Sequence, residues 1–97
     1  MLPATPALLI PKGNQGFNAW LYPNPGIGNI KVHITGKPAR VVDLLLTDNL
    51  GRVVTILPVY GFDGDHVETM QLRVPPGTYI LVVKREDDVI RRKLIYR

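Results

Sequence analysis

The sequence predicts an all-β domain with negligible helix content, and three observations predict it. From residue 17 onward, apolar and polar residues alternate with a period of two, the pattern of strands that bury one face. Nine Gly and nine Pro separate short apolar runs, as turns require. No stretch repeats apolar residues at the three- and four-residue spacing of an amphipathic helix.

Seven segments carry the strand pattern, each bounded by turn residues. The predicted strands are 18–22, 29–35, 40–48, 52–59, 66–73, 78–85 and 89–96. Seven short strands about a dozen residues apart are typical of an antiparallel immunoglobulin-like β-sandwich. The sandwich is expected to occupy residues 17–97, preceded by a Pro- and Gly-rich linker or extended arm over residues 1–16.

Residues able to perform chemistry are sparse. Nucleophilic catalysis needs an activated Ser, Cys, Thr or Lys beside a base, and this chain has no Ser and no Cys. The two histidines, His33 and His66, are expected on strand surfaces. The acidic stretch 63–65, followed by His66 and Glu68, lacks the ligand spacing of a calcium loop and is explained by turn propensity. We therefore expect no catalysis, no cofactor and no metal site.

The formal net charge is +4, and much of the basic excess lies near the end of the chain. These late residues are Lys84, Arg85, Arg91, Arg92, Lys93 and Arg97. No aromatic residues interleave with them as in a single-strand binder, so solvated strand faces are expected in place of a nucleic-acid site. A generic accessory module that spaces domains or binds glycans stays open as the alternative. Its glycan-binding face would be built from Trp20, Tyr22, Tyr60, Phe62 and Tyr96.

Short motifs follow one another in a fixed order along the chain. Their residues are Tyr22, Pro23, Asn24 and Pro25, then Asp48, Gly51 and Arg52, then Gly77 and Tyr79, and finally Lys93, Leu94, Ile95, Tyr96 and Arg97. The two prolines of the first motif fix φ and are expected to end the first strand. Asn24, between them, is expected to hold the bend by bonding its own backbone.

The two middle motifs, 48–52 and 77–79, have residues that are typical of turns. Gly51 suits the positive-φ position of a tight hairpin, and Arg52 is expected to direct its guanidinium toward Asp48. Gly77 is expected to free the turn that places Tyr79 in the core.

Taken together, the ordered motifs resemble the type A C-terminal sorting domain of the type IX secretion system of Bacteroidetes, over residues 18–97. The resemblance implies a non-catalytic domain attached to an N-terminal cargo domain. The outer-membrane translocon would recognise it, and a surface sortase usually removes it. It implies passage through the periplasm to the cell surface or the medium, with recognition concentrated in residues 93–97.

Two further expectations concern the ends of the domain. Cleavage is expected in the linker, between Pro11 and Asn18, and the final strand ends the chain as a sorting domain requires. An exposed first or last strand also leaves an edge-paired or strand-swapped dimer open as a partner state.

Overall fold

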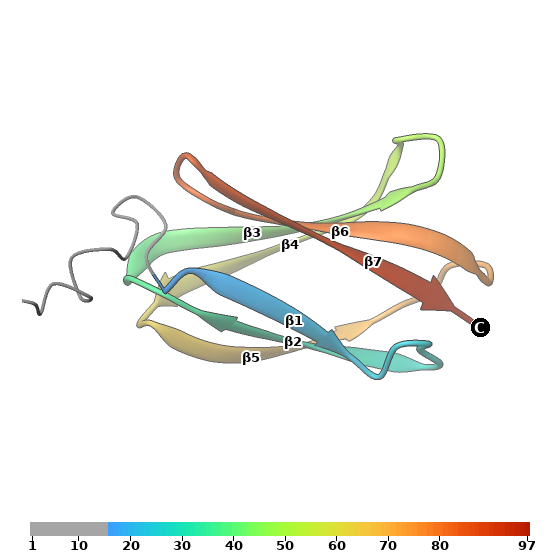
Figure 1. The fold of residues 1–97 in the computed structure, drawn as a ribbon, viewed down its shortest axis with the longest axis horizontal. Coiled ribbons are helices and arrows are strands. Elements are labelled where there is room, and N and C mark those ends of the chain that lie inside the picture. The colour runs from blue at the N-terminus through green and yellow to red at the C-terminus, as the bar shows by residue number, and fades with distance from the viewer. Residues whose placement is uncertain (1–15) are drawn as a thin grey trace, which may run out of the picture.

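The structure is a computed structural model of the 97-residue chain, and residues 16–97 are described. Two antiparallel sheets form the two layers of a sandwich (Figure 1). One sheet has the order β1 (Asn18–Tyr22), β2 (Asn29–Thr35), β5 (Asp65–Gln71). The other has the order β4 (Val53–Phe62), β3 (Ala39–Asp48), β6 (Gly77–Arg85), β7 (Asp88–Tyr96). The predicted seven-stranded immunoglobulin-like sandwich is confirmed.

Residues 16–97 contain no helix, and hence none long and apolar enough to cross a membrane. The arm predicted over residues 1–16 lies outside the described residues, apart from Gly16.

The core lies between the sheets and is built from alternate residues of the strands. Its largest fully buried side chains are Ile30, Val32, Ile34, Val42, Leu44, Leu46, Leu81, Val83 and Leu94. The predicted alternation is confirmed in β2, β3 and β6, and Tyr79, expected in the core, is buried. Each of these side chains contributes about 1.5–3 kcal/mol by burial, as an upper bound. In these three strands the period-two pattern fixes which face is buried.

The predicted end of the fourth strand is wrong. β4 continues beyond residue 59, through Gly61 at φ +65°, to Phe62. Phe62 is buried in the core, and this burial outweighs the turn propensity of the glycine-rich sequence around it. Pro58 is tolerated inside β4 because β4 is an edge strand, where proline is found in sheets.

Arg85, expected on a solvated strand face, is in fact buried, with 3% of its surface exposed. Its Nη1 donates to the carbonyl of Lys37 at 3.0 Å, and its Nη2 donates to the carboxylate of Asp88. Its guanidinium carbon lies 4.4 Å from the centre of the Phe17 ring. Phe17 and the 36–38 loop contact the end of β6, so the Arg85 side chain is packed between them and the strand.

The sandwich has two ends with different content (Figure 1). The entry end holds Gly16 and the turns 36–38, 63–64 and 86–87. The distal end holds the connections 23–28, 49–52 and 72–76 together with Arg97. A nine-residue strand such as β6 is roughly 30 Å long, which sets the separation of the two ends.

Candidate recognition site at the distal end

The segment after β1 lies along the outer edge of the terminal strand; we call residues 23–26 the strap. Gly26 N–H donates to the carbonyl of Ile95 at 2.8 Å, and Arg97 N–H donates to the carbonyl of Gly26 at 2.8 Å. The Asn24 side chain donates to the carbonyl of Lys93 at 2.8 Å and accepts the Ile95 N–H at 3.1 Å. The strap therefore pairs backbone groups that an edge strand would otherwise leave open.

Asn24 does not bond its own backbone, so that prediction is wrong. Both flanking residues are prolines, which have no N–H to donate, and both preceding peptide bonds are cis. The amide of Asn24 is then the polar group of this turn that reaches the unpaired edge of β7. The predicted end of the first strand at Pro23 is confirmed, since β1 ends at Tyr22.

Side chains of β7 add further bonds between the two sheets. Arg92 donates through Nε to the carbonyl of Ala19 at 2.7 Å and through Nη2 to Oδ1 of Asn18 at 2.6 Å. The hydroxyl of Tyr96 donates to the carbonyl of Gly28 at 2.8 Å. These bonds connect β7 to the start of β1 and to the β1–β2 connection, and none of them was predicted.

The five terminal residues divide into two groups. Leu94 and Tyr96 point inward and are buried, whereas Lys93, Ile95 and Arg97 are exposed. The terminal motif is thus part core and part surface, and its exposed members are the ones that a partner can contact.

Removing the strap's side-chain bonds is expected to weaken the fold. Asn24→Ala deletes two hydrogen bonds to β7 and should lower the free energy of unfolding by about 1–3 kcal/mol. Urea unfolding measures it, with Asn49→Ala, an exposed hairpin asparagine, as the matched control. Equal effects of the two substitutions would show that the strap bonds add no stability.

The β3–β4 hairpin has the predicted local chemistry. Oδ1 of Asp48 accepts the backbone N–H groups of Leu50 and Arg52, both at 2.9 Å. Its Oδ2 accepts Nε of Arg52 at 2.8 Å. Gly51 has φ +84°, a conformation that favours glycine. The predictions for Gly51 and for the Asp48–Arg52 pair are confirmed.

These bonds make Asp48 a pH-sensitive element. The backbone N–H of Arg52 is the main cause that lowers the pKa of Asp48 below its ordinary value. A lowered folded-state pKa contributes stability above the unfolded pKa of about 3.9 and loses it as the pH falls through the folded value. The stability difference between wild type and Asp48→Asn should thus persist from pH 7 to 5 and shrink below about pH 4. Thermal unfolding across this range measures it, and an unchanged difference at pH 3 would contradict it.

A groove of about 350 Å³ lies between the hairpin and the turn that enters β6. Asp48 pairs with Tyr79 across the β3–β6 ladder, and Gly77 pairs with Tyr96 across the β6–β7 ladder. The Tyr79 hydroxyl donates to the carbonyl of Pro75. The middle motifs therefore lie next to the terminal strand, and all the predicted motif residues gather at the distal end.

The predicted role of Gly77 is wrong. Its φ is not in the left-handed region, and a Cβ added there would lie 3.8 Å from the Tyr79 ring, an ordinary contact. Gly26 is the glycine that the site requires. A Cβ on it would approach Ile30 Cδ1 to 2.2 Å and the Pro23 carbonyl oxygen to 3.0 Å.

The histidines and acidic residues form pairs. Nε2 of His33 lies 2.7 Å from Oδ1 of Asp65, and Nε2 of His66 lies 2.7 Å from Oε1 of Glu68. Within residues 16–97, no group of three or more His, Cys, Asp or Glu is arranged to hold a metal ion.

The five aromatic residues considered for glycan binding do not share a face. Phe62 and Tyr96 are core residues. Trp20 and Tyr22 are exposed on β1 of the three-stranded sheet, whereas Tyr60 is exposed on β4 of the other sheet. The aromatic face proposed from the sequence is therefore wrong.

These features define a β-sandwich whose motif residues build one continuous end of the molecule, the arrangement of a recognition module. A family model, the secretion system C-terminal sorting domain, matches residues 20–97, and the chain belongs to this family. The domain is a C-terminal sorting signal of type IX secretion cargo, in a family of sorting signals with no catalytic role. No curated protein and no solved structure gives a significant match.

Proposed function

We propose that the export machinery recognises the distal end as one composite surface. The observation that carries this proposal is the bonding between the strap and β7, which joins residues about 70 positions apart in the sequence. The end of β1 presents Tyr22, the strap presents Pro23 to Pro25, and the terminal strand presents Lys93, Ile95 and Arg97. Leu94 and Tyr96 hold this surface in place from the core side.

The position of the distal end supports this role. A cargo domain joined ahead of Gly16 enters the sandwich at the opposite end, roughly 30 Å away along the strands (Figure 1). The distal end is then free to contact the outer-membrane translocon while the cargo remains attached.

We also propose that a surface sortase cuts the chain between Pro11 and Asn18. β1 begins at Asn18, so a cut before it leaves both sheets whole. The cargo would pass from the periplasm to the cell surface or the medium, and the domain itself would perform no chemistry.

Export of a reporter tests the proposed function. The 97-residue chain is fused behind a periplasmic reporter in a type IX-competent bacterium, and the surface fraction of the reporter is measured. The reporter should reach the surface with the chain and stay in the periplasm without it, or in a host lacking the translocon. Mass spectrometry of the surface reporter should place its C-terminus between residues 11 and 18. Equal surface display without the translocon would overturn the proposal.

Nucleic-acid binding is less well supported. A nucleic-acid site would use the late basic residues, but Arg85 is buried and Arg92 is bonded to β1.

An edge-paired dimer is also less well supported. A dimer through the last strand would have to displace the strap from Ile95. A folded fusion that stays in the periplasm would favour the accessory-module alternative.

A further inference from the structure

The outer face of the four-stranded sheet carries an aliphatic band across three strands. Leu45 of β3 pairs with Ile56 of β4 on one side and with Val82 of β6 on the other. Ile56 is 63% exposed, and the other two are half-buried on this face. Ile80 lies two residues before Val82 and widens the band on β6. A contiguous apolar row of this kind, unlike scattered exposed residues, marks an interaction surface.

Cations border this band on the β6–β7 side. Arg91 pairs directly with Val82, and Lys93 pairs with Ile80. Lys84 lies two residues after Val82 on the same face. None of these three cations has an ion pair within residues 16–97. Asp43 lies opposite Lys84 across the β3–β6 ladder, so the positive charge of the border is concentrated at Arg91 and Lys93.

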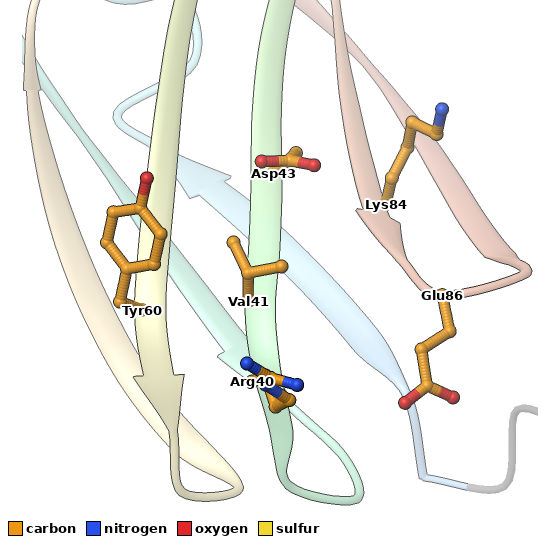
Figure 2. Close-up of a pocket in the computed structure, with 6 residues that line it drawn as sticks. All are labelled: Arg40, Val41, Asp43, Tyr60, Lys84 and Glu86. Atoms are coloured by element: carbon orange, nitrogen blue, oxygen red, sulfur yellow. The ribbon is translucent and has the colours of Figure 1, made fainter.

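A hollow of about 590 Å³ continues the face toward the entry end (Figure 2). Figure 2 shows Tyr60 and Lys84 on opposite sides of β3, with Val41 and Asp43 between them. Tyr60 is 77% exposed, and tyrosine is a frequent anchor of protein interfaces. The face thus combines an aliphatic centre, an aromatic residue beside a hollow, and a cationic border.

We propose that this face docks a protein partner whose surface has an aliphatic centre and an acidic border. The proposal rests on the proposed function, because the partner is a component of the export machinery. Protein–protein interfaces commonly have an apolar centre, and the charged residues around it face charges of opposite sign on the partner. An anionic membrane fits less well. The turn at the entry end of the face carries Glu86 and Asp87, which would face anionic headgroups.

Substituting Ile56 by an acidic and by a basic residue tests both the docking contact and the sign of the partner's charge. Ile56→Asp and Ile56→Lys remove the same apolar contact, but only the aspartate repels an acidic partner. In the reporter fusion, Ile56→Asp should lower the surface fraction about tenfold, and Ile56→Lys about threefold or less. Val67→Asp and Val67→Lys are the matched controls, since Val67 is 46% exposed on β5, an edge strand of the other sheet. Both controls should export as wild type.

The outcomes separate this proposal from the proposed function. Wild-type export by Ile56→Asp would overturn the docking face, and equal losses for the two Ile56 variants would overturn the acidic partner. A wild-type fusion that stays in the periplasm would overturn the proposed function and this proposal with it. Flotation of the purified chain with phosphatidylglycerol vesicles should show no binding; binding that Ile56→Asp abolishes would assign the face to a membrane.

A second variant covers the case in which Ile56→Asp does not fold. Arg91→Glu reverses one exposed charge of the border and should lower the surface fraction about tenfold, whereas Lys37→Glu at the entry end should leave it unchanged. Circular dichroism shows that each variant is folded. Wild-type export by a folded Arg91→Glu would again overturn the docking face.

Discussion

Removing residues 93–97 is expected to unfold the domain and, for that reason, to abolish export. Leu94 and Tyr96 are core side chains, and the strap loses its partner strand when they are removed. Losing a large core side chain costs about 2–5 kcal/mol, and a whole domain is stable by only about 5–15 kcal/mol. Thermal unfolding followed by circular dichroism should show no cooperative transition for the truncated chain.

This expectation affects how export of a truncated chain is interpreted. Loss of export after truncation is explained by loss of the fold, so it does not locate the recognised surface. A truncated chain that kept a cooperative transition would contradict the role of β7 in the core.

Arg85→Ala is expected to have the second largest effect. Removing one partner of a fully buried, hydrogen-bonded ion pair costs about 3–5 kcal/mol; because the Asp88 side chain is 22% exposed, about 3 kcal/mol is expected here. Here Asp88 loses its cation and the Phe17 ring loses the guanidinium over its face. Urea unfolding should show this loss in Arg85→Ala.

Arg91→Ala is the matched control for Arg85→Ala. Arg91 is exposed on β7, so its removal should change the free energy of unfolding by no more than about 0.5 kcal/mol. Comparable losses in the two variants would contradict a structural role for the buried arginine. Because Arg85 lies at the entry end, a folded Arg85→Ala chain keeps the distal end intact.

Local patterns in the sequence predict most of the fold. Alternation places Val32, Leu44 and Leu81 in the core because a one-residue shift would expose the whole face of a strand. The hairpin at Asp48 is equally predictable, since its partners lie within four residues along the chain. The end of β4 was not predictable, because the burial of Phe62 depends on the packing of both sheets.

The assembled site depends on contacts that no local pattern encodes. Asn24 and Ile95 are separated by 71 positions, and Arg92 and Asn18 by 74. Sequence reasoning placed the motifs in order but gave Asn24 a local partner and left Arg92 on the surface. Both errors arise because β1 and the connection that follows it reach β7 only once the two sheets have packed together.

The most direct test of recognition by the distal end compares two double variants that lose the same kinds of side chain. Lys93→Gln with Ile95→Thr changes exposed residues of the terminal strand, and Lys37→Gln with Val67→Thr makes matched changes away from the distal end. Both should unfold within a few degrees of wild type, because surface substitutions usually change stability by about 0.5 kcal/mol or less. The first should then lower the surface fraction of the reporter about tenfold and the second should not change it. Wild-type export by a folded Lys93→Gln/Ile95→Thr chain would contradict recognition at the distal end.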